Sequence, residues 1–202
     1  MNEINEKIIT VGMKVENFEF EGYDPKKNCF SKFSLKDSLK GKKWTVLVYY
    51  PADFTFVCPT ELEDLAEKHS ELEKMGVNVL SVSCDTKFVH MAWKENEKLL
   101  KNVSYFMATD PLGKMAKKFG VFDENSGVSY RATIIINPDG ILSGVEVNLN
   151  NVGRNMDELV RKIKALIYTY NNPQEVCPAK WEPGKKTLKP SEELVGKVYK
   201  NI

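Results

Sequence analysis

The sequence predicts an α/β fold in which helices pack on a mixed β-sheet. Two observations carry this prediction. Apolar runs of strand length alternate with helical patterns along the chain, and the turn at residues 137–140 joins two neighbouring runs as an antiparallel pair. A chain of 202 residues can bury one sizeable core. We expect residues 1–170 to form this domain and residues 171–202 to form an extended C-terminal tail.

The elements are expected in a simple order. Residues 1 to about 15 lead into a small hairpin between Phe18 and Phe33, and one helical turn follows at 34–39. Strands are predicted at 44–50, 78–83, 105–109, 131–136 and 141–148. Helices are predicted from Pro59 to about Met75, from Asp85 or Thr86 to Leu100, over 115–119 with Asp110-Pro111 as its entry, and over 156–170. Residues 124–127 are expected to be a loop, and four prolines keep the tail from forming a long helix.

Composition and charge exclude several classes of protein. Lys and Arg total 29 against 28 acidic residues, a net charge of +1, which disfavours nucleic acid and anionic membrane as partners. The first seven residues contain no apolar core of a signal peptide, and no apolar run is long enough to span a bilayer. We therefore expect a cytoplasmic protein.

The cysteines are widely spread and form no CxxC pair, and the chain has only two histidines. This spacing argues against a local metal-ligand motif. It also differs from the dense cysteine pattern of a small secreted domain, so any disulfide is expected to be transient and catalytic. The cysteines are Cys29, Cys58, Cys84 and Cys177.

Cys58 stands where a predicted strand gives way to a predicted helix. The run 44–50 is rich in β-branched and aromatic residues, as in a strand buried on both faces, and Pro59 suits the first turn of a helix. Cys58 is therefore expected at or next to the N-cap, where the helix dipole favours a thiolate.

Three acidic residues in the first turn, Glu61, Glu63 and Asp64, oppose the charge of a thiolate. A reactive cysteine there needs a cation from elsewhere in the fold, and arginine suits because it stays charged and donates hydrogen bonds in a fork. The chain has only three arginines. Arg131 begins a strand and Arg154 precedes a helix, where functional side chains are common, whereas Arg161 is expected to be solvated in mid-helix.

These residues carry a resemblance to a known family. The pattern Pro51-x-x-x-Thr55-x-x-Cys58 resembles the active-site signature of the peroxiredoxins, and residues 175–181, Glu-Val-Cys-Pro-Ala-Lys-Trp, resemble the resolving-cysteine segment of the typical 2-Cys group. The segments 129–133 and 152–154 also match. The resemblance is closest to the bacterial alkyl hydroperoxide reductase C group and extends over residues 8–198.

The resemblance implies a thioredoxin-like three-layer sandwich and a thiol-dependent peroxidase. Cys58 would be the peroxidatic nucleophile, which attacks the terminal peroxide oxygen and becomes a sulfenic acid. Thr55 would hydrogen-bond the reacting oxygen, and Arg131 would stabilise the thiolate and the charge that develops as the O–O bond breaks. Pro51 would shield the pocket from water.

The resemblance also assigns roles to residues further along the chain. Glu61 would orient the arginines, including Arg154. Cys177 would be the resolving cysteine, which condenses with the sulfenic acid in a disulfide between two subunits after the first turn of the Cys58 helix unwinds. The chain lacks the glycine insertion and C-terminal Tyr-Phe helix of easily inactivated relatives, so Cys58 is expected to resolve before it overoxidises.

The implied substrates are hydrogen peroxide and small organic hydroperoxides, and no metal, haem or flavin is expected in the chain itself. An external dithiol, from a flavoprotein disulfide reductase or a thioredoxin, would regenerate the enzyme. The implied assembly is a homodimer that forms a ring of five dimers, with the dimer-to-dimer contact near residues 86–90. Two alternatives stay open: a general thiol-disulfide oxidoreductase, which the missing CxxC disfavours, and a holdase-like chaperone ring.

The remaining thiols and histidines fit structural roles better than catalytic ones. Cys84 ends an apolar strand and is expected to be a small buried side chain, and Cys29 is expected in an exposed loop. His69 and His90 have no partner pattern, so packing or solvation is expected for both.

Overall fold

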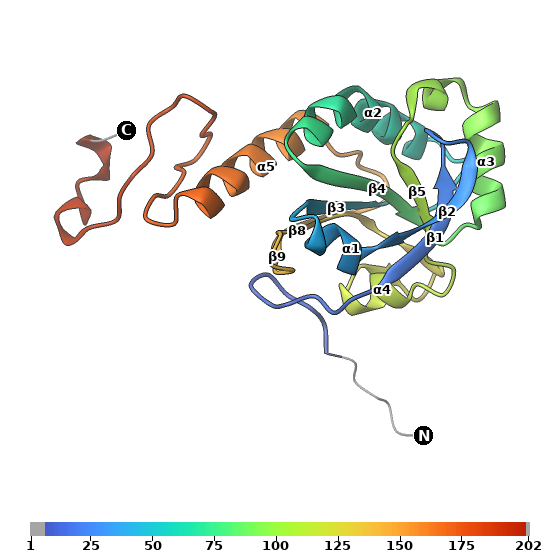
Figure 1. The fold of residues 1–202 in the computed structure, drawn as a ribbon, viewed down its shortest axis with the longest axis horizontal. Coiled ribbons are helices and arrows are strands. Elements are labelled where there is room, and N and C mark those ends of the chain that lie inside the picture. The colour runs from blue at the N-terminus through green and yellow to red at the C-terminus, as the bar shows by residue number, and fades with distance from the viewer. Residues whose placement is uncertain (1–6, 201–202) are drawn as a thin grey trace. The chain divides into compact units, whose positions relative to one another are not determined.

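The computed structural model describes residues 7–200 and contains a seven-stranded mixed sheet in the order β2-β1-β5-β4-β3-β8-β9 (Figure 1). Strands β3, β4 and β5 run parallel, and every other neighbouring pair is antiparallel. The strands are β1 (Glu19–Asp24), β2 (Cys29–Ser34), β3 (Trp44–Tyr49), β4 (Val77–Ser83), β5 (Phe106–Thr109), β8 (Arg131–Ile136) and β9 (Leu142–Asn148). The predicted α/β fold with a mixed sheet is confirmed.

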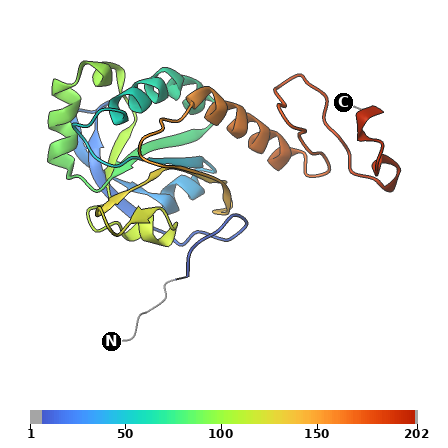
Figure 2. The same cartoon turned by 180° about the vertical axis from the view of Figure 1, so that it is seen from behind.

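Helices cover both faces of this sheet, α2 and α3 on one face and α1 and α4 on the other, as Figure 2 shows from behind. Side chains of adjacent residues in extended chain point to opposite faces, as Tyr49, the last residue of β3, and Tyr50, which follows it, show. The ring of Tyr49 packs on Phe119 just after α4, and the ring of Tyr50 packs on Trp93 of α3. The helices are α1 (Leu35–Lys40), α2 (Cys58–Lys74), α3 (Lys87–Asn96), α4 (Lys114–Lys118) and α5 (Met156–Asn171).

The core forms around β3, whose six residues are all buried. A strand in the middle of a sheet with helices on both faces has no solvent side, which explains its continuous apolar sequence. Helix α2 packs against β4 and ends where expected: Met75 is its C-cap, and Gly76 follows with φ +79°. Burial therefore fixes both elements that meet at Cys58: β3 is buried on both faces, and α2 packs against the sheet.

Two helix boundaries differ from the sequence prediction. The helix expected to reach Leu100 ends at Asn96, because Glu97 is extended and its carboxylate accepts from the amide of Leu99 to begin a 3-10 turn at Lys98–Asn102. Pro111 lies outside the next helix, which begins at Lys114. Asp110 still caps that helix, since its Oδ2 accepts from two first-turn amides at 3.0 Å.

A small hairpin flanks the loop at 124–127 and was not predicted. Its strands, β6 (Phe122–Asp123) and β7 (Val128–Ser129), form a separate two-stranded sheet. Two residues are too few to show a strand pattern in the sequence. The hairpin leads directly into β8 and so sets where Arg131 begins that strand.

The chain divides into two compact units between Arg154 and Asn155, so α5 groups with the tail. The tail contains two short 3-10 helices, Glu192–Leu194 and Val198–Lys200. Within residues 7–200 no helix is both long enough and apolar enough to cross a bilayer. The domain boundary at residue 170 stays a prediction.

The pairing of β1 with β5 requires a glycine at position 22. A Cβ atom at Gly22 would lie 2.2 Å from the carbonyl oxygen of Met107 and 2.7 Å from the ring of Phe106. We expect Gly22→Ala to lower the free energy of unfolding by about 1–3 kcal/mol, as overpacking does, measured by urea denaturation. Gly41→Ala is the control, because its Cβ would meet no atom closer than 3.5 Å. Equal stability of the two variants would contradict the prediction.

Candidate active site

Cys58 is the first residue of α2, where the loop after β3 turns into the helix. Val57 is the N-cap and makes no side-chain capping bond, and Pro59 lies in the first turn. The amide groups in the first turn of a helix attract negative charge. The Cys58 side chain is completely buried, so the thiol lies at the positive end of α2 and away from solvent.

The loop before α2 makes a sharp turn at Phe54, whose φ of +54° is unusual for a residue with a side chain. This turn brings the Thr55 hydroxyl back to the carbonyl oxygen of Ala52, to which it donates at 2.8 Å. The hydroxyl has one hydrogen, so its oxygen remains only as an acceptor. Pro51 is half-buried at the start of the same loop.

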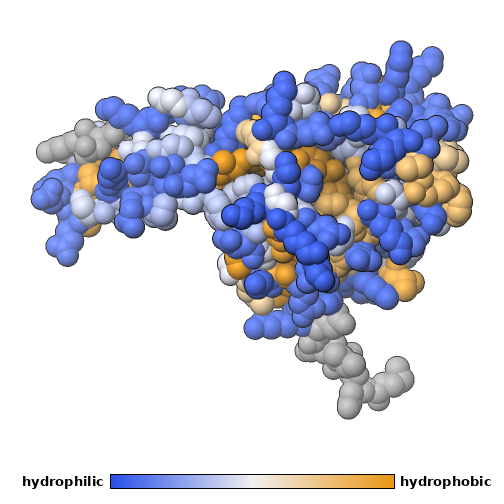
Figure 3. All heavy atoms as spheres, in the orientation of Figure 1, coloured by the Kyte–Doolittle hydropathy of each residue, from blue (hydrophilic) through white to orange (hydrophobic). Residues whose placement is uncertain are grey.

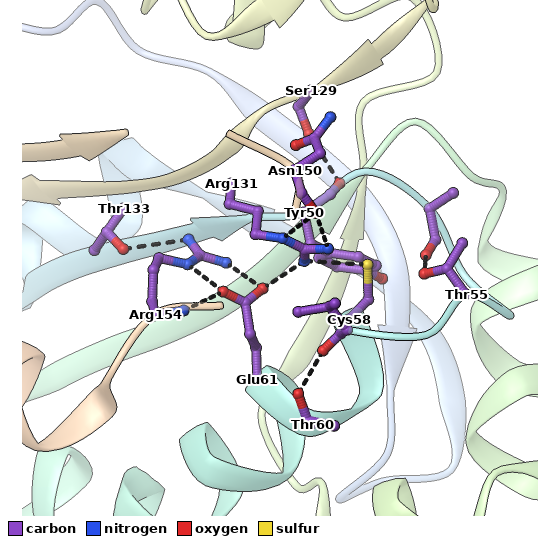
Figure 4. A network of polar contacts seen from close by, with 12 residues as sticks. Tyr50, Thr55, Cys58, Thr60, Glu61, Ser129, Arg131, Thr133, Asn150 and Arg154 are labelled. Atoms are coloured by element: carbon purple, nitrogen blue, oxygen red, sulfur yellow. Dashed lines mark hydrogen bonds and ion pairs between the residues drawn. The ribbon is translucent and has the colours of Figure 1, made fainter. Parts of the chain in front are cut away.

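Arg131, the first residue of β8, comes from the strand next to β3 and points toward Cys58 (Figure 4). Its Nη1 donates to Cys58 Sγ at 3.4 Å and to Glu61 Oε2 at 2.8 Å. Its Nε and Nη2 donate to the backbone oxygen of Asn150 at 3.0 and 2.8 Å. Burial alone would lower the pKa of Arg131, but Cys58 and Glu61 raise it overall. The guanidinium is therefore charged and held on three sides.

Glu61 joins Arg131 to Arg154. Its Oε1 accepts from Arg154 Nε and from the Arg154 backbone amide, both at 2.8 Å, and its Oε2 accepts from Arg154 Nη2 at 3.0 Å. Arg154 Nη1 also donates to Thr133 Oγ1. Burial alone would raise the pKa of Glu61, but the hydrogen bonds and charges of the two arginines outweigh it and hold the pKa below its ordinary value. This two-point contact fixes the carboxylate in one orientation.

The buried charges of the site do not cancel among the arginines and the glutamate. Arg131 and Arg154 carry two positive charges, and Glu61 carries one negative charge. All three side chains are at most 3% exposed. A buried net charge is costly unless it is balanced. A thiolate on Cys58 would bring the sum to zero, and the thiolate is the nucleophilic form of cysteine.

A second buried network supports the loop before α2 and was missed in the sequence. His90 of α3, for which packing or solvation is expected from the sequence, is fully buried. Its Nδ1 lies 2.8 Å from Asp53 Oδ2, and its Nε2 lies 3.1 Å from the carbonyl oxygen of Ala108. Tyr50 donates to Asp53 Oδ1 at 2.7 Å, and the Asp53 amide donates to Asp85. Burial raises the pKa of Asp53 despite these partners. No short-range pattern pairs a histidine with an acid 37 positions away.

Cys177 lies in the second unit, half-buried, and its Sγ donates to the carbonyl oxygen of Ala165 at 3.9 Å. Burial raises the pKa of the Cys177 thiol, with Arg161 acting in the opposite direction. Cys84 is also half-buried, and burial together with Asp110 and Asp85 raises its pKa to about 11. Cys29 is exposed, at the first position of β2. All four thiols are free in this structure.

Arg161, expected to be solvated, is partly so, because 27% of its side chain is exposed. Its Nε and Nη2 bind both carboxylate oxygens of Glu158 at 2.6 and 2.9 Å, and its Nη1 donates to the carbonyl oxygen of Trp181 at 3.0 Å. Helical spacing predicts the contact with Glu158. The contact with Trp181 depends on how the tail folds back, which no local pattern shows.

Fold and site together define a class of protein. A mixed sheet between helical layers carries a buried cysteine at the start of a helix, and a paired arginine faces its sulfur. This combination is that of an enzyme with a thioredoxin-like fold that works through a cysteine thiol.

Comparison with known proteins identifies the family. The AhpC/TSA family matches residues 11–145, and the C-terminal domain of 1-Cys peroxiredoxin matches residues 165–201. Alkyl hydroperoxide reductase C of Staphylococcus aureus is 47% identical over 198 residues, which cover 98% of this chain and all of that protein. The chain belongs to the AhpC/TSA family and is a peroxiredoxin, an enzyme that reduces peroxides with a cysteine thiol.

Solved structures agree with this assignment. The crystal structure of Enterococcus faecalis AhpC has a TM-score of 0.79 and 39% identity, over 85% of this chain and all of that one. The reduced 2-Cys peroxiredoxin of Plasmodium vivax has a TM-score of 0.85 and 35% identity, over 91% of this chain and 94% of that one. The family resemblance and the thioredoxin-like fold predicted from the sequence are therefore confirmed.

Loss of the Glu61 charge should unbalance the site. Glu61→Gln keeps the shape of the side chain but removes the carboxylate that lies between two buried guanidinium groups, so the free energy of unfolding should fall by about 3–5 kcal/mol at neutral pH. Urea denaturation measures this change. Glu67→Gln, an exposed position on the same helix, is the control and should change stability by less than about 0.5 kcal/mol.

The effect of Glu61→Gln should depend on pH. The pKa of Glu61 in the folded state is lowered from 4.5, so its stabilising contribution is complete above that value and is lost as the pH falls below it. The stability difference between wild type and Glu61→Gln should therefore shrink as the pH is lowered below about 4.5. A difference that stays constant over this range would refute the proposed charge balance.

Proposed function

We propose that this peroxiredoxin reduces hydrogen peroxide and small organic hydroperoxides through Cys58. The observation that carries the proposal is the contact of Cys58 Sγ with Arg131 inside a buried cluster that needs one more negative charge. The name of the Staphylococcus aureus relative, an alkyl hydroperoxide reductase, supports organic hydroperoxides among the substrates. Residues 1–170 would form the peroxidase domain.

In the proposed first step the Cys58 thiolate attacks the terminal oxygen of the peroxide. An S–O bond forms, the O–O bond breaks, and the leaving oxygen takes a proton to become water or an alcohol, which leaves Cys58 as a sulfenic acid. Arg131 balances the negative charge as it moves from sulfur to oxygen. The Thr55 hydroxyl donates its hydrogen bond to Ala52, so its oxygen accepts a hydrogen bond from the O–H group of the peroxide. Pro51 shields the pocket from water.

In the proposed second step the Cys177 thiol attacks the sulfenic sulfur, which forms a disulfide between two subunits and releases water. Cys58 is completely buried, so a second thiol reaches it only when the first turn of α2 unwinds. Residues 171–202 would form the tail that brings Cys177. An external dithiol, from a flavoprotein disulfide reductase or a thioredoxin, would then reduce the disulfide in the cytoplasm.

We propose a homodimer and a ring of five dimers as the assembly. Strand β9 is an edge of the large sheet, and its outer side chains Val145 and Val147 are 41% and 47% exposed, which suits pairing with a second copy. A second apolar area lies over α3 and the β1–β2 hairpin (Figure 3). There the exposed rings of Phe30 and Phe88 pack edge to face. This area, next to residues 86–90, would form the dimer-to-dimer contact.

Replacement of each cysteine tests the proposed chemistry. Cys58→Ser should abolish peroxide-dependent NAD(P)H consumption with either reductase system, because no thiol remains beside Arg131 to attack the peroxide. Cys177→Ser should oxidise once and then stop turning over in both systems. Cys29→Ser, an exposed thiol outside the site, should behave as wild type. Turnover by Cys58→Ser would refute the proposal.

A non-reducing gel tests the disulfide. After one equivalent of peroxide, wild type and Cys29→Ser should run as covalent dimers, and Cys58→Ser and Cys177→Ser should run as monomers. A monomeric band for oxidised wild type would exclude a disulfide between protomers. Reduction of insulin without peroxide would instead favour a general thiol-disulfide oxidoreductase.

Sedimentation velocity tests the ring. Phe88→Glu places a charge in the proposed contact between dimers, so the ring should dissociate into dimers. Val11→Glu is the matched control, since Val11 is 59% exposed and Phe88 is 60% exposed. A wild-type protein that sediments as a dimer, or a Phe88→Glu variant that stays a ring, would contradict this arrangement.

A further inference from the structure

The segment that carries Cys177 folds back on itself next to the cysteine. Val176 and Leu188 exchange two backbone hydrogen bonds, at 2.9 and 3.1 Å, in an isolated antiparallel bridge. Cys177 is thus the residue immediately after Val176, at the start of a closed loop of the tail. Its backbone moves freely only after that bridge opens.

One carboxylate oxygen holds this loop to α5. Glu175 Oε2 accepts from the hydroxyl of Tyr168, on α5, at 2.6 Å and also accepts from the hydroxyl of Thr187. Thr187 lies on the returning strand of the loop, beside Leu188. Both bonds go to a charged acceptor, which makes them stronger than bonds between neutral groups. Glu175 therefore connects α5 to both ends of the loop that the bridge closes.

A second contact holds the chain on the other side of Cys177. The Trp181 side chain is 2% exposed, and its ring packs on the ring of Tyr168 with centroids 5.0 Å apart. The indole Nε1 donates to the carbonyl oxygen of Lys185, and Arg161 donates to the carbonyl oxygen of Trp181. Tyr168 therefore holds the chain on both sides of Cys177. Its hydroxyl binds Glu175, which precedes the cysteine, and its ring packs on Trp181, which follows it.

These contacts leave Cys177 in a state unsuited to attack. Its Sγ is half-buried against α5, where it donates to the carbonyl oxygen of Ala165 at 3.9 Å. Burial raises the pKa of this thiol, whereas disulfide formation requires a thiolate that can reach the second sulfur. The arrangement protects the thiol until the tail is released.

We propose that Tyr168, Glu175 and Thr187 form a latch that withholds Cys177, so that opening of the latch sets the rate at which the Cys58 sulfenic acid is resolved. The inference rests on the proposed function. The three residues are positioning residues, since they act through Cys177. While the latch is closed, the sulfenic acid can react with a second peroxide to give a sulfinic acid and water or an alcohol, so the latch also sets the sensitivity to overoxidation.

The kinetic test weakens the latch by one hydroxyl at a time in the full-length protein. Thr187→Val and Tyr168→Phe each remove one hydrogen bond to Glu175 and keep the shape of the side chain. Thr169→Val is the matched control, because within residues 7–200 that hydroxyl bonds to carbonyl groups of its own helix. Reduced enzyme is mixed with hydrogen peroxide, quenched at intervals and analysed by mass spectrometry for sulfenic acid, disulfide and sulfinic acid.

We expect both latch variants to form the disulfide about tenfold faster than wild type, the factor that corresponds to about 1.4 kcal/mol for a hydrogen bond to a charged group. The rate of Cys58 oxidation should not change, and less sulfinic acid should accumulate at a given peroxide concentration. Thr169→Val should match wild type. Disulfide formation that is unchanged or slower in both latch variants would overturn the proposal. A slower rate would mean that these three residues hold Cys177 in position for the attack and do not withhold it.

A second measurement needs no peroxide. In a Cys58→Ser background, iodoacetamide labelling of Cys177, followed by peptide mass spectrometry, reports how often the latch opens. Labelling should be about tenfold faster with Thr187→Val or Tyr168→Phe and unchanged with Thr169→Val. Equal labelling of all variants would overturn the latch. If the labelling depends on the latch but Cys58 of the wild-type protein does not react with peroxide, the proposed function is refuted and the latch is still supported.

Discussion

The site depends on the carboxylate of Glu61, which lies between two arginines, one of which reaches the sulfur of Cys58. Arg154 holds this carboxylate with three hydrogen bonds, one of them from its backbone. The carboxylate then holds Arg131 at the position from which Nη1 reaches Cys58. The cluster joins α2, β8 and the chain before α5, which are far apart in the sequence. The same contacts that tie these elements together therefore also set the charge beside the thiol.

The sequence alone made Glu61 look unfavourable, because an acid in the first turn of α2 opposes a thiolate at Cys58. The structure gives the opposite result, since the negative charge of Glu61 is taken up by Arg154 and part of Arg131. One positive charge remains for the sulfur. Glu61, which follows soon after the cysteine in the same helix turn, thus acts on it through arginines that lie 70 and 93 positions beyond Glu61 in the sequence.

Local patterns predicted those parts of the fold that local forces determine. The buried strand β3, the start of α2 at Cys58 and the end of α2 before Gly76 follow from burial, proline and glycine. The small number of arginines and their positions made Arg131 and Arg154 candidate partners of Cys58, and the family resemblance was needed to give each of them a role. Neither source paired His90 with Asp53 or placed Arg161 on Trp181, because these contacts form only once distant segments have folded together.

The hydrogen bond from Thr55 to Ala52 has a consequence for the choice of substrate. Because the single hydroxyl hydrogen is engaged, the Thr55 oxygen can bind only a group that brings a hydrogen of its own. In the proposed mechanism a hydroperoxide satisfies it with the terminal O–H, which also fixes which of its two oxygens is presented to sulfur. A dialkyl peroxide has no such hydrogen and would leave the Thr55 oxygen unsatisfied. The loop before α2 is thus suited to select hydroperoxides by hydrogen-bond polarity and to set their orientation, whatever the size of the alkyl group.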